Sequence, residues 1–289
     1  MNRRYVFSLF TTLLLLLPVT AQAGKAFNIG IVTDGPVEHT SWSPELFKNE
    51  LLALTKADFD VRFPAEKQLD GKWSAKRIAA AHRQLQNDPE VDMVLALGYV
   101  SSAVAAQTRP LHKPTFAPFV MDAELQGLLK VGNTSGVKNL NYLSGGADFV
   151  SDLEVFNSVG DCKNIGVFVD EANYTAQPGL IRRAREVTAA AGVELVFIQQ
   201  HSRNEDLAAR LPTTVDCVVV TDLPRLGTEA MDRLIAALIE KNLPSYSLLD
   251  SQLVERGLLM AQAPASDWRR LARRNALNMH AVLHGESAE

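Results

Sequence analysis

Short apolar runs alternate along the chain with longer stretches whose apolar residues recur every three or four positions. Runs of the first kind predict buried β-strands, and stretches of the second kind predict amphipathic helices. In the first half of the chain, strands are expected at residues 27–33, 59–63, 91–97 and 115–120. Helices are expected at residues 45–56 and 75–86, with Ser43 and Ser74 as their N-terminal caps.

The apolar run at residues 91–97 leads into a turn at Gly98 and then into an alanine-rich helix that extends to Gln107. An almost uninterrupted apolar run suits a parallel strand covered on both faces. Ser101 or Ser102 can cap the helix. This arrangement places free backbone N–H groups at the carboxyl end of a parallel sheet, where open α/β folds bind ligands, often anionic ones. An ordinary strand-to-helix turn has the same pattern, so the segment alone does not decide between the two.

The second half of the chain repeats the alternation. Strands are expected at residues 164–169, 193–198, 215–220 and 245–249, and helices at residues 149–159, 179–191, 205–211 and 228–241. A further strand at residues 257–263 and a helix at residues 266–284 complete the pattern. Because such alternation builds parallel sheets through right-handed crossovers, the sequence predicts an α/β protein with two doubly wound parallel-sheet lobes.

Residues 130–146 are rich in glycine, asparagine, serine and threonine, which is typical of a loop. We interpret this stretch as a crossover between the lobes, with a second crossover near residues 250–257. The first lobe would then comprise residues 24–130 and 252–289, and the second lobe residues 131–251, including the crossovers. Two lobes joined by hinges make a cleft that the carboxyl ends of both sheets line.

The N-terminal residues 1–23 have the features of an export signal. Arg3 and Arg4 precede an apolar stretch at residues 6–19, and Ala21 and Ala23 offer small side chains around a cleavage point. The apolar stretch is short and contains serine and threonine, which argues against a permanent membrane helix. No cysteine near Ala23 can accept a lipid. We therefore expect a soluble periplasmic protein with the signal removed near Ala23.

Composition narrows the functional classes. The net charge is −4, and removal of Arg3 and Arg4 with the signal makes the chain more negative. An acidic chain without a lysine-rich tract is a poor candidate for binding nucleic acid or anionic membranes. The two cysteines, Cys162 and Cys217, are too few for a cysteine-rich metal site. An oxidising compartment would allow them to form a disulfide, but two buried free thiols are at least as compatible with the sequence.

Sequence motifs for catalysis are absent: the chain has no Gly-x-Ser-x-Gly elbow, no His-Glu-x-x-His, no phosphate loop and no Gly-x-Gly-x-x-Gly. His280 and His284 lie four residues apart on one face of the last expected helix, but no acidic third ligand lies nearby in the sequence. We therefore expect a protein that is not an enzyme and that has neither a metal nor a cofactor.

Several segments resemble substrate-binding proteins of ABC transporters with the type I periplasmic-binding fold, specifically the group that includes tryptophan and tyrosine binders. Their order and spacing cover nearly the whole mature chain: Ile29-Gly30-Ile31, Val91-Asp92-Met93-Val94 before Ser101-Ser102-Ala103, Asn133-Thr134-Ser135-Gly136-Val137, Asn164-Ile165-Gly166-Val167, Val215-Asp216-Cys217-Val218-Val219-Val220, Leu253-Val254-Glu255-Arg256-Gly257 and residues 268–283. The resemblance implies a bilobal protein that closes on a small polar molecule, an amino acid or similar, and delivers it to an ABC permease.

The resemblance also implies where the ligand binds. In this family the turn after the third strand holds a ligand carboxylate, so Ser101 and Ser102 would supply hydroxyl and backbone N–H groups. Asp222 and Asp250 end strands of the second lobe and can accept hydrogen bonds from a ligand ammonium group, although each can also cap a helix or shape a turn. The other expected ligand-binding residues lie at strand ends or offer flat apolar walls: Thr33, Asp34, Tyr99, Phe119, Asp170, Tyr174 and Thr221. The aromatic members of this set, and Trp42 after the first strand, more often serve only in packing.

Two other classes of function are compatible with the sequence. A periplasmic ligand sensor or an efflux-associated accessory protein would keep the lobes without a role in transport. An exported α/β hydrolase is the third class, although it would need a nucleophile or a metal that the sequence does not display.

Overall fold

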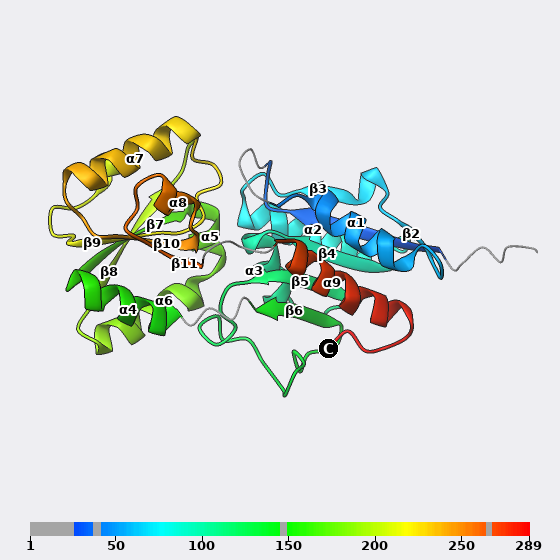
Figure 1. Ribbon diagram of the computed structural model, residues 1–289. Helices are drawn as coiled ribbons and strands as arrows, with labels where there is room; N and C mark the ends of the chain where they lie inside the picture. Colours follow the sequence, from blue (N-terminus) through cyan, green and yellow to red (C-terminus); the bar gives the residue numbers. More distant parts are fainter. Residues whose placement is uncertain (1–25, 37–41, 145–148, 264–267) are drawn as a thin grey trace, which may run out of the picture.

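The computed structural model describes residues 26–36, 42–144, 149–263 and 268–289, with only the backbone described for residues 149, 150, 249, 250, 262 and 263. These residues form two α/β lobes that lie side by side (Figure 1). The predicted export signal at residues 1–23 lies outside the described residues and stays a prediction. Within the described part of the chain, no helix combines the length and the apolar character needed to cross a membrane.

The first lobe is built on six parallel strands. They are β1 (Ala26–Thr33), β2 (Asp60–Arg62), β3 (Gln68–Asp70), β4 (Met93–Leu97), β5 (Thr115–Val120) and β6 (Leu140–Ser144). Their order in the sheet is β2-β1-β4-β5-β6, and β3 continues the edge strand by pairing with the end of β1. The helices of this lobe are α1 (Pro44–Thr55), α2 (Ala75–Asn87), α3 (Tyr99–Gln107) and α9 (Trp268–Leu283), with a 3₁₀ turn at Ala65–Lys67.

Helices cover both faces of the first sheet. On one face, Leu51 of α1 and Met279 of α9 join the buried cluster that contains Ile31 of β1. On the other face, α2 supplies Leu85 and α3 supplies Val100 to a second buried cluster. Since β4 is buried along its whole length, its uninterrupted apolar sequence matches a central strand with both faces covered.

The second lobe repeats this plan with five parallel strands. They are β7 (Asn164–Asp170), β8 (Glu194–Gln200), β9 (Cys217–Val220), β10 (Ser245–Asp250) and β11 (Met260–Ala263), in the order β11-β10-β9-β7-β8. Helices α4 (Phe149–Gly160) and α6 (Pro178–Ala190) pack on one face, and α7 (Thr228–Glu240) packs on the other. The short helices α5 (Glu171–Ala176) and α8 (Gln252–Glu255) follow β7 and β10, and a 3₁₀ turn spans Ala208–Arg210.

These two sheets confirm the predicted fold class. Ser43 and Ser74 cap α1 and α2 as predicted: their Oγ atoms accept hydrogen bonds from the N–H groups of Leu46 at 3.3 Å and Arg77 at 3.4 Å. Residues 205–211, predicted as a helix, contain only the 3₁₀ turn, and α5 and α8 were not predicted.

Two predicted lobe boundaries need correction. β6 belongs to the first sheet although residues 131–251 were assigned to the second lobe, and β11 belongs to the second sheet although residues 252–289 were assigned to the first. The stretch rich in glycine and asparagine is a loop within the first lobe that leads into its last strand. Turn residues mark a loop but do not specify which elements it joins. The chain therefore changes lobe after β6 and again after β11.

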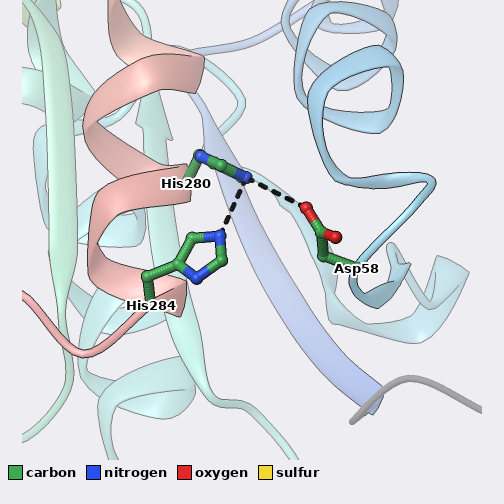
Figure 2. Close-up of side chains that lie close together, drawn as sticks. All are labelled: Asp58, His280 and His284. Atoms are coloured by element: carbon green, nitrogen blue, oxygen red, sulfur yellow. Dashed lines mark hydrogen bonds and ion pairs between the residues drawn. The ribbon is translucent and has the colours of Figure 1, made fainter.

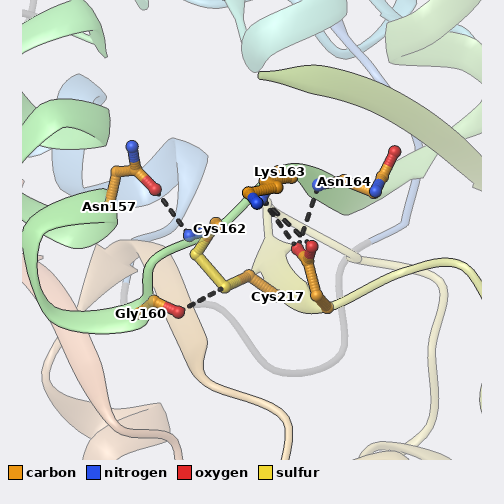
Figure 3. Close-up of a disulfide and its surroundings, with 7 residues drawn as sticks. Asn157, Gly160, Cys162, Lys163, Asn164 and Cys217 are labelled. Carbon is orange, nitrogen blue, oxygen red and sulfur yellow. Dashed lines mark hydrogen bonds between the residues drawn. A yellow bond between two sulfur atoms is a disulfide. The ribbon is translucent and has the colours of Figure 1, made fainter. Parts of the chain in front are cut away.

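Cys162 and Cys217 form a disulfide that joins the start of β7 to the start of β9 (Figure 3). This is one of the two alternatives that the sequence left open. The backbone around the bridge is held by side chains: Asn157 Oδ1 accepts a hydrogen bond from the N–H group of Cys162 at 2.6 Å, and the carboxylate of Asp216 accepts one from that of Asn164 at 3.0 Å. Residues far apart in the sequence are therefore fixed together at the ends of two neighbouring strands.

The two lobes contact each other through α5. Ala172 of this helix lies in the same buried cluster as Val32 and Ile78 of the first lobe. Gln126 of the first lobe also donates a side-chain hydrogen bond to Gln177, directly after α5. The lobes thus meet through both apolar packing and a polar contact.

Candidate functional site

A cleft of about 360 Å³ lies between the lobes at the carboxyl ends of β1, β3 and β4. The first lobe lines it with the ends of these strands and the start of α1, and the second lobe with the loop after β9. Three carboxylates, Asp34, Asp70 and Asp222, are among the lining residues. None of the described lining residues is a lysine or an arginine.

Asp34 occupies the N-terminus of α3. Its carboxylate accepts hydrogen bonds from the N–H groups of Val100 at 2.9 Å and Ser101 at 2.6 Å, and from the hydroxyl of Ser101 at 2.5 Å. A helix N-terminus favours an anion because its N–H groups are unpaired and the helix dipole is positive there. The anion-binding turn predicted from the sequence is therefore filled by a carboxylate of the protein itself.

Gly98 makes this contact possible. Its φ is +119°, which disfavours residues with a side chain, and a Cβ at this position would overlap the carboxylate of Asp34. Gly98 is also the N-cap residue, since α3 begins at Tyr99. The prediction that Ser101 or Ser102 caps the helix is therefore wrong, because Asp34, directly after the neighbouring strand β1, provides the capping side chain.

Ser102 is fully buried and joins three elements of the first lobe. Its hydroxyl donates a hydrogen bond to the carbonyl of Ala96 at 2.9 Å and accepts one from the N–H group of Phe119 at 3.1 Å. It thereby ties β4, α3 and β5 together. In this conformation the hydroxyls of Ser101 and Ser102 are both used within the protein and are not presented to the cleft.

Burial controls the protonation of Asp34. It raises the pKa of this carboxyl from its ordinary value of 3.8 to about 6, against the opposing effect of the hydrogen bonds from Ser101 and Val100, and the negative charge of Asp170 adds to the rise. Asp34 therefore carries a proton in mildly acidic solution and a negative charge at neutral pH.

This pKa predicts a pH dependence of stability. Between about pH 4 and pH 6 the folded protein holds the Asp34 proton more tightly than the unfolded chain does. The favourable contribution of Asp34 to the free energy of unfolding is therefore fully present below about pH 4 and is lost as the pH rises through 6. We expect the free energy of unfolding of the wild type, measured against that of Asp34→Asn, to fall by roughly 2–3 kcal/mol between pH 4 and pH 7. Urea unfolding of both proteins across this range measures the difference, and a pH-independent difference would contradict the assignment.

The second lobe has a corresponding carboxylate at the start of α5. Asp170 caps this helix by accepting a hydrogen bond from the N–H group of Ala172 at 2.8 Å. It also forms an ion pair with Arg225, whose Nε lies 2.6 Å from Asp170 Oδ2. Burial raises the pKa of Asp170, and the guanidinium of Arg225 opposes part of that rise. Asp170 is thus a buried carboxylate whose hydrogen bonds and ion pair lie within the second lobe.

Aromatic side chains form the apolar walls of the cleft. Trp42, Trp73 and Tyr99 line it. Phe119 lies behind them, with its ring centroid 4.5 Å from that of Trp42 and 5.6 Å from that of Tyr99. Phe119 itself is buried in the core of the first lobe. Trp42, expected from the sequence to serve mainly in packing, therefore packs and also lines the cleft.

Trp73 was not found by sequence reasoning. Its indole lies against Gly35, where any side chain would overlap the ring. The backbone N–H group of Trp73 donates a hydrogen bond to the carbonyl of Asp34 at 2.7 Å. Lys72 and Trp73 both have positive φ, so the turn after β3 directs the indole back to the end of β1. Gly71 before this pair was the available sequence signal for such a tight turn.

A smaller cavity of about 80 Å³ lies between Leu125 of the first lobe and Val169 of the second. Thr221 lines this cavity, together with Asn173 and Gln177. Its wall is otherwise mainly apolar, and its volume is a fraction of that of the cleft. The cleft is accordingly the better candidate for a small-molecule site.

The predicted site residues thus divide into groups. Thr33, Asp34, Tyr99 and Asp222 line the cleft, and Thr221 lines the smaller cavity. Ser101, Ser102, Phe119 and Asp170 are buried and line neither of these two cavities. Tyr174 packs against Phe197, at a ring-centroid distance of 5.5 Å. The backbone of Asp250 ends β10, but its side chain lies outside the described structure.

Comparison with known proteins identifies the fold but not a family. No family model and no curated protein matches the sequence. Among solved structures, an ABC domain in complex with L-Trp from Streptococcus pneumoniae is 17% identical, with a TM-score of 0.62 over 91% of this chain and 87% of that one. A conserved domain protein from Vibrio cholerae has the same identity and coverages, with a TM-score of 0.64.

Proteins with a different role share this fold. A LacI family transcriptional regulator from Bifidobacterium animalis is 14% identical, with a TM-score of 0.54 over 91% of this chain and 92% of that one. These identities are too low to carry a ligand or a role from one protein to another. They do establish the architecture, and this chain has the type I periplasmic-binding fold.

Proposed function

We propose that this protein is an exported solute-binding protein that captures a small molecule with an ammonium group beside an apolar or aromatic part, and that it delivers this molecule to an ABC-type importer. The ligand would be an amino acid or a related amine. The observation that carries the proposal is the lining of the cleft, where carboxylates of both lobes meet aromatic side chains without a described lysine or arginine.

The lining suits a cation for two reasons. Carboxylates gathered in a cleft with low-dielectric walls create a negative potential that attracts positive ligands. The faces of tryptophan and tyrosine rings attract ammonium groups through their quadrupoles. Asp222 lies on the second lobe and the exposed Asp70 on the first, so a ligand that contacts both would favour the closed arrangement of the lobes.

The ligand carboxylate expected from the family resemblance meets a competitor. Asp34 already accepts the hydrogen bonds of the first turn of α3. A ligand carboxylate would have to displace Asp34 before it could use the backbone of Ser101. An amine without a carboxylate has no such requirement, so we include amines in the proposed ligand class. Ser101, Ser102 and Asp250 stay proposed ligand-binding residues for an amino acid.

A thermal-shift screen tests the proposal because a ligand that binds only the folded state raises the melting temperature. The panel pairs each aromatic and aliphatic amino acid with the amine formed by its decarboxylation, and it includes the corresponding carboxylic acids without an amino group. We expect shifts with amines or amino acids and none with the acids. Shifts with the acids alone would contradict the proposal.

Asp222→Asn provides the matching mutational test. This change keeps the shape of the side chain but removes its charge, so we expect the affinity for the ligand found in the screen to fall by a factor of about ten or more. Glu229→Gln in the first turn of α7 is the control, since it removes the same charge from an exposed position of the same lobe. Calorimetry should show unchanged binding for this control. Equal affinities of both variants and the wild type would exclude Asp222 from the site.

Transport needs a separate test. Uptake of the labelled ligand is measured in cells with and without this protein. Uptake depends on the protein if it is a component of an importer, and does not depend on it if the protein is a ligand sensor. The disulfide supports the exported location, since such bridges persist mainly in oxidising compartments.

A further inference from the structure

A cluster of two histidines and one aspartate lies outside the cleft, where the end of α9 meets the loop between α1 and β2. His280 lies in the last turn of α9, His284 directly follows the last residue of that helix, and Asp58 lies in that loop. Figure 2 shows the three side chains pointing toward one another. The acidic member of the cluster is thus supplied by a segment more than 200 residues away in the chain.

The distances between these side chains fit a shared metal ion. His280 Nε2 and His284 Nε2 are 3.2 Å apart. Two nitrogens bound to one tetrahedral zinc ion at about 2.0–2.1 Å would be separated by about 3.3 Å. His280 Nε2 lies 3.8 Å from Asp58 Oδ2, and all three ligand atoms lie within 4.8 Å of one another. Asp58 is half exposed in a loop, so a small movement of its side chain would complete the set.

The surroundings of the cluster also suit a bound ion. The ring of Phe59 meets that of His284 edge to face, at a centroid distance of 4.8 Å, and lies 6.1 Å from that of His280. It forms an apolar wall that orients both imidazoles. The side chain of His284 is exposed, so an ion can enter from solvent.

We propose that His280, His284 and Asp58 form a binding site for a divalent transition-metal ion of the zinc, nickel or copper class. Imidazole nitrogens with one carboxylate are ligands that these ions prefer, whereas magnesium and calcium prefer oxygen ligands only. Each histidine would contribute Nε2 and Asp58 a carboxylate oxygen, with water completing the coordination. The ion would link the end of α9 to the loop after α1, and would therefore fasten the C-terminal helix to the rest of the first lobe.

Metal titration of the untagged full-length protein tests this site. The protein must carry no histidine tag because a tag would bind the same ions. We expect calorimetry with Zn²⁺ or Ni²⁺ to show one site per chain. Co²⁺ should give the visible absorption bands of a cobalt ion with a low coordination number. Mg²⁺ should not bind at this site. Absence of binding by Zn²⁺, Ni²⁺ and Co²⁺ would overturn the proposal.

Variants locate the bound ion. Substituting a residue that only hydrogen-bonds to a metal ligand commonly weakens metal binding by about 10–100-fold. Loss of a ligand itself, in His280→Gln or His284→Gln, should therefore weaken metal binding by at least about tenfold. Asp58→Asn should also weaken it. His112→Gln is the matched control, because His112 is exposed elsewhere on the first lobe. If the His112 and His284 variants bind the ion equally well, the ion lies elsewhere and the proposal is wrong. Circular dichroism without metal checks that each variant is folded.

Discussion

Arg225→Met is expected to lower the free energy of unfolding by about 3 kcal/mol at pH 7, because it leaves the buried carboxylate of Asp170 without its partner. Arg225 Nε lies 2.6 Å from Asp170 Oδ2, and Arg225 also donates hydrogen bonds to the carbonyls of Gln200 at 2.9 Å and His201 at 3.0 Å. One side chain therefore joins the ends of β7 and β8 to the loop before α7. Removing it breaks a buried ion pair and leaves two carbonyls without this donor.

The loss should depend on pH in a predictable direction. Burial already raises the pKa of Asp170 in the wild type, and removal of the guanidinium that opposes this rise should raise the pKa further. At low pH the carboxyl is protonated in both proteins, so the ion pair no longer contributes to the difference. The destabilisation caused by Arg225→Met should therefore be smallest in acid and should grow as the pH rises through the pKa of Asp170.

Two controls separate this ion pair from other effects of the substitution. Asp170→Asn combined with Arg225→Met should recover much of the stability, because asparagine can still cap α5 and no charge remains buried. Arg256→Met removes the partner of Asp232, at 2.6 Å, in an exposed pair of the same lobe, and should cost less than about 1 kcal/mol. Urea unfolding compares the four proteins. Equal losses for Arg225→Met and Arg256→Met would show that the burial of Asp170 does not strengthen its pair.

The sequence was sufficient to predict those strands and helices whose apolar residues form one clear run or period within a single element. The uninterrupted runs at β4 and β9 indicated buried parallel strands, and the serines before α1 and α2 indicated where those helices begin. The two short helices were not predicted, because four to six residues are too few for a clear periodic pattern. For α5, the start is fixed by the Asp170 cap and its position by packing on the first lobe.

The candidate site was less predictable, because its contacts join segments far apart in the chain. Asp34-Gly35-Pro36 has the sequence of a turn, and nothing near it indicates that the carboxylate caps α3, which begins 65 residues later. That contact exists because β1 and β4 are neighbours in the sheet. The pairing of Asp170 with Arg225, 55 residues away, arises in the same way at the ends of β7 and β9.

The second large effect is expected from removing the disulfide in Cys162→Ala combined with Cys217→Ala. The bridge spans 55 residues of sequence, and the loss of chain entropy in the unfolded state for a loop of this length corresponds to about 4 kcal/mol. Both cysteines are buried, so alanine is a better replacement than serine, whose hydroxyl would need a partner. We expect guanidinium unfolding of the double variant to show a loss of about 2–4 kcal/mol in the second lobe.

Reduction of the wild type separates the cross-link from the packing of the sulfur atoms. The reduced protein keeps both sulfurs, so the loss that it shares with the double variant belongs to the cross-link, and any further loss in the variant belongs to the cavity left by the two sulfurs. Hydrogen exchange should localise the effect, with faster exchange in β7 and β9 and little change in β1 and β4, whose sheet contains neither cysteine. Equal acceleration in both sheets would mean that the lobes unfold as one unit and that the α5 contact couples them. Unchanged stability after complete reduction would show that the bridge forms between strand ends already held together, as the hydrogen bonds of Asp216 and Asn157 hold them here.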